Sequence, residues 1–225
     1  MRVAVIYHCD QTTGRLDDEL AAAGADVERF RLHEGAGIPV ERSFDRVILL
    51  GGEMGAYEDH AYPWMPVEKA WLRDLVDHEV PVLGICLGSQ LLAAGLGGRA
   101  FPADGAEAGV VDLCLTAAGD DEPALVAARP KAFALHGDTF QLPPDATLLA
   151  RSALYPQAFR LGSALGIQFH PDVDLDLGLQ WGKEATALRA RAGVDYDSYS
   201  RQLEVHDREL DRRSRELFRL WLATA

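Results

Sequence analysis

The sequence contains little cysteine and no long apolar run. Its 225 residues include three cysteines, Cys9, Cys86 and Cys114, which form no CxxC pair. This sparse, odd set does not fit a disulfide framework and favours a reducing compartment. The apolar run at residues 1–7 is too short for a signal peptide, and no stretch approaches the roughly 20 apolar residues that span a bilayer. We therefore expect a soluble, cytoplasmic protein with no membrane partner.

Basic residues are also scarce relative to acidic ones. Lys and Arg number 22 against 35 Asp and Glu, which gives a formal net charge of −13. Binding to a phosphate backbone needs clustered basic side chains, so this balance argues against a nucleic-acid partner. The seven histidines show no metal-ligand spacing, and no metal site is predicted. The chain lacks repeats and low-complexity linkers, and we expect one domain over residues 1–225.

The hydrophobic pattern predicts an α/β fold with a mostly parallel central sheet flanked by helices. Short apolar runs alternate with amphipathic segments, as in consecutive βα units. The first expected strands cover residues 3–7, 26–32, 46–50 and 81–85. The expected helices between and after them cover residues 16–23, 63–79 and 89–96. Shorter strand-like pieces follow at 110–115, 132–135, 147–150, 158–161 and 164–169, and predict a small antiparallel addition. From about residue 174 the pattern is helical, with a charged helical extension from about residue 195.

The stretch Gly84–Gln90 (GICLGSQ) is the most informative part of the sequence. It places Cys86 between a predicted strand and a predicted helix, with a glycine two positions away on either side. Nucleophile elbows use this arrangement because a sharp turn must present the side chain while neighbouring backbone passes closely. The amide groups that open the helix favour a thiolate and can hold an oxyanion. Cys86 is therefore the candidate nucleophile, whereas Cys9 and Cys114 lack such a setting.

Four motifs together resemble the class I glutamine amidotransferases. Gly84–Gln90 looks like their nucleophile motif, and Gly166–Pro171 (GIQFHP) resembles their histidine motif. Gly51–Tyr57 (GGEMGAY) is similar to their oxyanion loop in the GMP-synthetase-like subgroup, and His136–Phe140 (HGDTF) matches a further segment of that subgroup. The motifs occur in the order typical of the family. The resemblance implies a flavodoxin-like fold and a glutaminase domain that stands alone.

The resemblance also implies a catalytic mechanism. Cys86 would attack the side-chain amide of glutamine and form a γ-glutamyl thioester as ammonia departs. His170 would take the thiol proton, protonate the leaving nitrogen and then activate water. Backbone amides of Gly52 and Leu87 would form the oxyanion hole. This chemistry needs no cofactor.

Three further residues are implied to bind the substrate. Gln90 lies one helical turn after Cys86, at a position that the family uses to contact bound glutamine. His136 is the candidate contact from the HGDTF segment, and Gly51 is the candidate from the oxyanion loop. Glu107 is a looser match to an acidic residue that lines the site in relatives.

The sequence departs from the family at Asp172, where members usually carry glutamate two places after the histidine. This carboxylate orients the imidazole and stabilises its charged form. The aspartate arm is shorter by one methylene, about 1.5 Å. Three outcomes follow: Asp172 still reaches His170, Asp174 takes its place although its position suggests a helix cap, or the base is poorly oriented and turnover is slow.

Three functions are consistent with these residues. The first is a glutaminase that passes ammonia to a separate synthetase or acceptor subunit, because the chain has no G-x-x-x-x-G-K-[ST] loop of its own. The second is a stand-alone γ-glutamyl hydrolase that acts on a conjugate of glutamate. The third is a regulatory or binding homologue weakened in catalysis by Asp172. The first two would bind glutamine or a γ-glutamyl small molecule, and the product distinguishes them.

Overall fold

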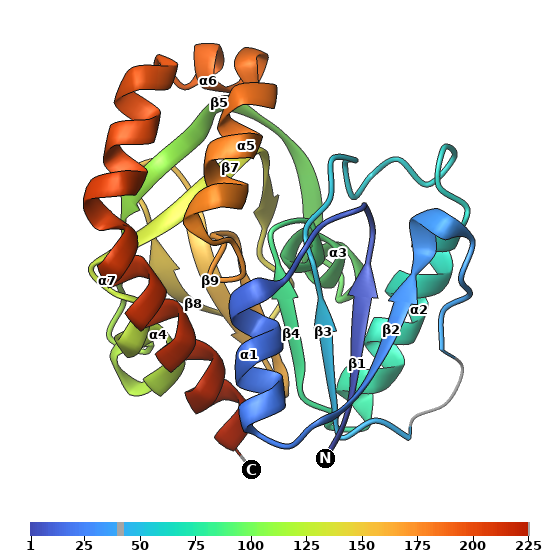
Figure 1. Ribbon diagram of the computed structural model, residues 1–225. Coiled ribbons are helices and arrows are strands. Elements are labelled where there is room, and N and C mark those ends of the chain that lie inside the picture. The colour runs from blue at the N-terminus through green and yellow to red at the C-terminus, as the bar shows by residue number, and fades with distance from the viewer. Residues whose placement is uncertain (40–42, 225) are drawn as a thin grey trace.

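The chain folds into a central sheet with helices on both faces (Figure 1). A computed structural model describes residues 1–39 and 43–224. The strands are β1 (Arg2–Tyr7), β2 (Asp26–Arg31), β3 (Arg46–Leu49), β4 (Val82–Ile85), β5 (Arg99–Asp112), β6 (Cys114–Leu115), β7 (Lys131–Gln141), β8 (Thr147–Arg151), β9 (Pro156–Leu161) and β10 (Ala164–Ile167). The α-helices are α1 (Gly14–Ala22), α2 (Trp64–Asp77), α3 (Leu87–Gly95), α4 (Pro123–Ala128), α5 (Leu175–Glu184), α6 (Thr186–Arg191) and α7 (Tyr196–Ala223). Two 3-10 turns are η1 (Leu32–Glu34) and η2 (Gly119–Asp121).

The main sheet has the strand order β2-β1-β3-β4-β10-β9-β8-β6 within the described residues. The first five strands of this order pair in parallel, and β9, β8 and β6 extend the sheet antiparallel. This arrangement confirms the predicted mostly parallel sheet with a small antiparallel addition. Because β2 and β3 lie on opposite sides of β1, the loops after β1 and β3 diverge. Ligands of open α/β sheets bind at such a switch point, beyond the carboxyl ends of the strands.

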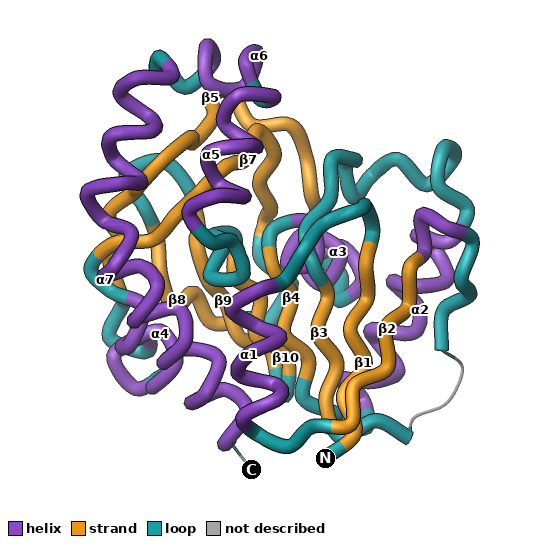
Figure 2. Tube along the Cα trace, viewed as in Figure 1, coloured by secondary structure: helices purple, strands orange, loops and turns teal. Residues whose placement is uncertain are grey.

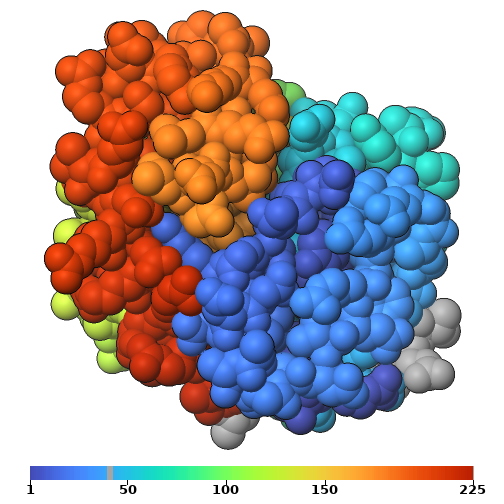
Figure 3. Space-filling model, viewed as in Figure 1, coloured from blue at the N-terminus to red at the C-terminus, as the bar shows by residue number. Residues whose placement is uncertain are grey.

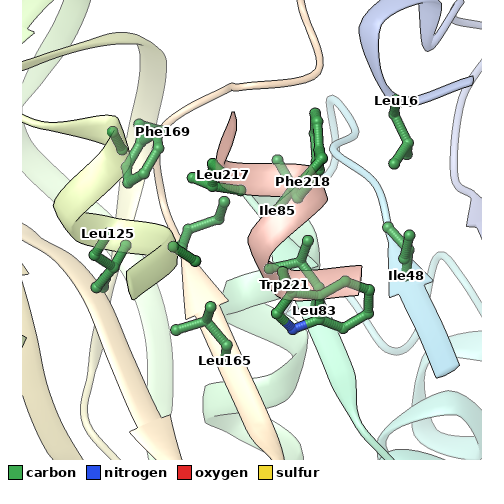
Figure 4. Packing of buried hydrophobic residues seen from close by; sticks show 14 of the residues in the cluster. Leu16, Ile48, Leu83, Ile85, Leu125, Leu165, Phe169, Leu217, Phe218 and Trp221 are labelled. Atoms are coloured by element: carbon green, nitrogen blue, oxygen red, sulfur yellow. The ribbon is translucent and has the colours of Figure 1, made fainter. Parts of the chain in front are cut away.

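The inner parallel strands β1, β3, β4 and β10 are buried on both faces, which explains their largely apolar sequences. Every residue of β3, β4 and β10 is buried, and so is all of β1 after Arg2. One face packs against α2 and α3, and the other packs against α1, α4 and the end of α7. Figure 4 shows the second interface, where Leu217, Phe218 and Trp221 of α7 lie over Ile85 and Leu83 of β4.

A second, two-stranded antiparallel sheet is formed by β5 and β7. Helices α5, α6 and the first half of α7 lie beside it, as the purple and orange segments of Figure 2 show. Loops gather at the carboxyl ends of β1, β3 and β4, on the side of the molecule that carries α5 and α6.

The sequence placed the main-sheet elements within a few residues but misjudged this second sheet. The strand expected at 110–115 is only the end of β5 together with β6, because the first half of β5 alternates small, charged and proline residues without a regular period. Helix α4 was not predicted, since its six residues are too few to show helical periodicity. Within the described part of the chain, no helix is long and apolar enough to cross a membrane.

Candidate active site

Cys86 occupies the sharp turn between β4 and α3. Its backbone has φ 51° and ψ −109°, a conformation that L residues rarely adopt. Such a strained position is typical of a nucleophile presented at a strand-to-helix turn. The amide of Cys86 donates to the carbonyl of Ile167 in β10 at 2.8 Å, which holds the turn against the neighbouring strand. The side chain is largely buried but lines a cavity.

The two glycines that flank Cys86 allow this turn to pack closely. A Cβ atom added at Gly84 would lie 2.5 Å from the carbonyl oxygen of Gly88. A Cβ atom added at Gly88 would lie 2.5 Å from the carbonyl oxygen of Leu49 in β3. Neither position can hold a side chain unless the backbone moves, so the G-x-C-x-G spacing follows from the geometry of the turn.

His170 and Asp172 form a buried pair just beyond β10. The Nδ1 atom of His170 lies 3.2 Å from Oδ1 of Asp172, and both side chains are at most 3% exposed. The other carboxylate oxygen, Oδ2, has no hydrogen-bond partner among the described residues. Asp174 instead caps α5 by accepting from the amide of Leu177 at 2.9 Å. The shorter aspartate lies within hydrogen-bonding distance of the imidazole, as the first of the three outcomes requires.

The ring of His170 faces Cys86 with its other edge, and the two groups interact electrostatically. Burial, the largest influence, lowers the pKa of His170, but the charges of Cys86 and Asp172 and hydrogen bonds to both raise it to about 10. The imidazole is thus charged at neutral pH when the sulfur opposite it is a thiolate. Trp181 of α5 packs edge-on against this ring, with centroids 5.2 Å apart, and helps to exclude water from it.

Two glutamine side chains connect Cys86 to β7. Gln168, which is fully buried, points its amide nitrogen at the sulfur of Cys86 across 3.6 Å. Its carbonyl oxygen accepts from Nε2 of Gln90 at 3.2 Å, and the same nitrogen lies 3.3 Å from the carbonyl of Asp138. Sequence reasoning gave Gln168 no role, although it belongs to the GIQFHP motif.

The loop after β3 lies against the nucleophile, as the oxyanion-loop motif predicts. A Cβ atom added at Gly51 would be 3.1 Å from Cε1 of His170 and 3.6 Å from Cβ of Cys86. One added at Gly52 would be 2.6 Å from Cδ2 of Leu87. The absence of side chains at both positions lets this backbone approach His170, Cys86 and Leu87.

A buried histidine–glutamate pair holds the start of this loop. The Nδ1 atom of His8 lies 3.0 Å from the carbonyl oxygen of Leu50, and its Nε2 atom lies 3.0 Å from the carboxylate of Glu68 in α2. Both side chains are fully buried, and Trp64 stacks on the imidazole. Burial lowers the pKa of His8, but Glu68 and the backbone raise it overall. Because both partners accept, the imidazole donates from both nitrogens and links α2 to the residue before Gly51. Sequence reasoning missed this pair.

A cavity of about 650 Å³ lies over Cys86. The predicted site residues in its wall are Cys86, His170, Gly52, Leu87, Gln90 and His136. Gly51 and Asp172 lie behind this wall and support it. In Figure 3 the orange segment with α5 and α6 borders the cyan loop after β3 and the dark blue turn after β1, and these three segments line the cavity.

One face of α5 and α6 forms the side of the cavity that the sequence did not predict. Its residues recur at helical spacing and are Leu177, Gln180, Trp181, Glu184, Leu188 and Arg191. The sequence showed these positions only as part of a charged helical region, so nothing in them distinguished a cavity wall from a solvent-exposed surface.

His136 has both ring nitrogens occupied within the protein. Nε2 lies 2.9 Å from the carboxylate of Glu107 in β5, and Nδ1 lies 2.8 Å from the carbonyl of Asp138. Glu107 also accepts from Nε2 of Gln157 at 2.7 Å. A direct contact between His136 and a substrate is therefore limited to its ring carbons, and its hydrogen bonds hold β5 against β7.

The other two cysteines, Cys9 and Cys114, lie in different settings from Cys86. Burial, together with nearby carboxylates and Cys86, raises the pKa of Cys9 to about 12, so it stays a thiol although it lines the cavity. Cys114 is exposed on β6. In residues 1–39 and 43–224, no group of three His, Cys, Asp or Glu side chains could hold a metal ion.

Comparison with known sequences identifies related proteins. The profile of the family described as "Glutamine amidotransferase class-I" matches residues 4–179. The chain is 31% identical over 182 residues to one subunit of the glutamine-hydrolyzing GMP synthase from Saccharolobus solfataricus, with 77% of this chain and 90% of the relative covered. It is 42% identical over 131 residues to a glutamine-hydrolyzing GMP synthase from Thermomicrobium roseum, where the match covers 56% of this chain but only 23% of that longer relative.

Solved structures with the same arrangement cover nearly the whole chain. A glutamine amidotransferase from Thermotoga maritima superposes with a TM-score of 0.85 at 28% identity and covers 100% of this chain and 99% of its own. A glutamine amidotransferase from Methylobacillus flagellatus superposes with a TM-score of 0.83 at 27% identity, covering 97% of this chain and 92% of its own. Both comparisons extend through α5, α6 and α7, beyond the end of the family profile.

Proposed function

The chain belongs to the class I glutamine amidotransferase family, and from this premise we propose that it hydrolyses the side-chain amide of glutamine through a thioester on Cys86. The ammonia would pass to a separate acceptor subunit. The observation that carries the proposal is the buried series Cys86, His170 and Asp172 below a cavity, with the sulfur on a strained turn. The Saccharolobus solfataricus relative, itself a separate subunit of a synthase, supports transfer to a partner protein.

In the first half-reaction the thiolate of Cys86 attacks the amide carbon of the substrate. The developing oxyanion would be held by the backbone amides of Gly52 and Leu87, two residues that line the cavity. The imidazolium of His170 gives its proton to the leaving nitrogen, and ammonia departs as the thioester forms. Asp172 orients the ring with Nε2 toward the sulfur, because its carboxylate accepts a hydrogen bond from Nδ1–H.

In the second half-reaction water cleaves the thioester. His170, now neutral, accepts a proton from the water molecule as it attacks, and the same oxyanion site stabilises the second tetrahedral intermediate. Glutamate and the free thiolate result. Gln90 supports substrate binding from the first turn of α3, while Gly51 and His136 shape the wall through their backbone and packing.

A γ-glutamyl hydrolase is the second candidate, and the volume of the cavity favours it. About 650 Å³ lies in the range of sites for drug-sized ligands and exceeds what a molecule as small as glutamine fills. A γ-glutamyl amide with a larger leaving amine would occupy more of the wall formed by α5 and α6. The third candidate, a regulatory homologue without turnover, has less support because Asp172 lies within hydrogen-bonding distance of His170.

The deciding experiment is a product assay with purified protein and a panel of glutamine and γ-glutamyl amides. Release of ammonia from glutamine supports the amidotransferase activity, and faster release of an amine from a γ-glutamyl conjugate supports the hydrolase. Cys86→Ala is the control that must abolish both. If no substrate turns over and a glutamine-like electrophile labels Cys86 no faster than free cysteine, the regulatory alternative replaces both.

A further inference from the structure

One basic side chain faces the cavity from a helix beyond the family profile. Among the described residues of the cavity wall, Arg191 is the only lysine or arginine. It lies at the end of α6, whereas the family profile ends at residue 179. The acidic residues in the same wall are Asp10, Glu53, Glu58, Asp138 and Glu184. Any negatively charged part of a substrate is therefore repelled from most of the wall and attracted to Arg191.

The guanidinium of Arg191 is held in place without a neutralising carboxylate. Its Nη2 atom donates to the carbonyl oxygens of Ala103, Gly105 and Gly137 at 2.9, 3.0 and 3.3 Å. Its Nη1 atom lies 2.7 Å from where a Cβ atom at Gly137 would stand, so the glycine makes room for it. Within the described ranges, Arg191 forms no ion pair. Its position is fixed by backbone, and its charge remains available to a ligand.

Arg191 and Cys86 line the same cavity. Gln90, one helical turn after Cys86, points its amide at the carbonyl of Asp138, the neighbour of Gly137. Burial and a hydrogen bond to Asp138 raise the pKa of Tyr57 in the oxyanion loop, and the charge of Arg191 acts on the same hydroxyl in the opposite direction. A substrate that occupies this cavity next to the sulfur therefore shares it with the guanidinium.

We propose that Arg191 binds the α-carboxylate of the γ-glutamyl substrate and so selects substrates with a free glutamyl carboxyl group. The proposal rests on the proposed function, since it names the substrate group that the same cavity recognises. A planar guanidinium pairs with a carboxylate through parallel hydrogen bonds, which fixes the orientation of the substrate as well as its affinity. Arg191 is thereby a specificity residue supplied by α6.

The test crosses enzyme variants with substrates. For Arg191→Gln we expect KM for L-glutamine to rise about 10- to 100-fold while kcat changes little, because a charge-assisted hydrogen bond is lost in the ground state and the transition state alike. L-Glutaminamide, which lacks the α-carboxylate, should be a poor substrate for the wild type. Arg191→Gln should have the same KM for it as the wild type. Arg201→Gln, on the exposed side of α7, removes the same charge away from the cavity and should behave as wild type.

The outcomes separate recognition from a structural role. If Arg191→Gln raises KM for glutamine and for glutaminamide by the same factor, Arg191 only holds α6 to the second sheet, and the proposal is overturned. If Arg191→Gln does not fold, Arg191→Lys keeps the charge and should still raise KM for glutamine but not for glutaminamide. If Arg191→Gln raises KM for γ-glutamylglycine but not for γ-glutamyl methylamide, Arg191 binds the carboxylate of the leaving amine. The α-carboxylate assignment is then overturned.

A second readout keeps this inference distinct from the proposed hydrolysis. The rate at which a diazoketone analogue of glutamine alkylates Cys86 measures binding next to the sulfur without requiring turnover. Saturable labelling that is lost in Arg191→Gln, and also lost when the analogue carries an α-carboxamide, supports Arg191 even if no amide is hydrolysed. If glutamine is hydrolysed but Cys86 is labelled at the same rate with and without the α-carboxylate, the proposed hydrolysis is supported and the role of Arg191 is overturned. If glutamine is not hydrolysed and Cys86 is not labelled, both the proposed hydrolysis and the role of Arg191 are overturned.

Discussion

Replacing Glu68 by glutamine removes the negative charge opposite His8 and keeps the shape of the side chain. In the native protein the imidazole donates to this carboxylate at 3.0 Å and to the carbonyl of Leu50 at 3.0 Å, and both side chains are fully buried. Breaking one side of a buried ion pair typically costs about 3–5 kcal/mol, because the remaining charge has no partner. At about 2–4 °C per kcal/mol for a protein of this length, we expect the Tm to fall by roughly 10 °C.

The pH dependence of this loss follows from the pKa of His8, which the fold raises above 6.5. The ion pair stabilises the wild type fully below about pH 6.5 and loses its effect as the pH rises through the folded-state pKa. In Glu68→Gln, burial is the main remaining influence on the pKa of His8 and lowers it. The folded variant therefore favours the neutral ring. The difference in stability between the two proteins should therefore be largest below pH 6.5 and shrink as the pH rises.

The measurements are urea unfolding between pH 5 and 9 and ammonia release from glutamine. We also expect kcat to decrease, since His8 holds the carbonyl that precedes the oxyanion loop at Gly51. Glu204→Gln on the exposed face of α7 is the matched control and should change neither quantity. If Glu68→Gln lowers the free energy of unfolding by less than about 1 kcal/mol, or by an amount that does not vary with pH, the assignment of a charged buried pair is refuted.

Three further changes test the reacting groups and the turn that holds them. Cys86→Ser should abolish turnover and lower the pKa of His170 from about 10 toward its ordinary range, measured by NMR titration of the ring. In the native enzyme kcat/KM should fall as the pH rises through about 10, where His170 loses the proton it gives to ammonia. Asp172→Asn should move this decrease to lower pH and reduce kcat about 10²-fold or more. Gly88→Ala should cost about 1–3 kcal/mol in urea unfolding, because the new methyl group would lie 2.5 Å from the carbonyl oxygen of Leu49.

Each of these changes has an outcome that contradicts its reasoning. An unchanged His170 titration in Cys86→Ser would mean that the sulfur carries no charge next to the ring. An alkaline limit that does not move in Asp172→Asn would assign it to another group. Gly37→Ala is the control for Gly88→Ala, since an added Cβ there meets nothing within 4 Å, and equal losses in both would contradict the packing argument.

The sequence predicted the main sheet, and it pointed to the candidate residues at the turn, because both depend on short-range patterns. Strands buried on two faces read as continuous apolar runs, and the turn at Cys86 needs glycine at Gly84 and Gly88 for steric reasons that hold in any such turn. The contact between His170 and Asp172 spans two residues, so the motif alone brought the pair together, although only the structure shows that the shorter arm reaches.

The parts that sequence reasoning missed depend on contacts between distant segments. His8 and Glu68 are sixty residues apart in the chain and meet only because α2 packs behind β1 and β3. Arg191 lies in a short charged helix, where the composition is the same for a cavity wall and for an exposed surface. Prediction of such a site requires knowing which face of α5 and α6 turns inward. This face packs near the second sheet, and the sequence identified only the end of the first strand of that sheet.

Helix α7 determines when this protein can finish folding during its synthesis. The side chains that cover one face of the main sheet, including Leu217, Phe218 and Trp221, lie within its last turns. While a ribosome is still making that helix, α1 and α4 cover only part of this face of the sheet, and a nascent chain with exposed apolar strands is prone to aggregate. We therefore expect the completed fold to form only after residues 210–222 have emerged, with the nascent chain depending on chaperones until then.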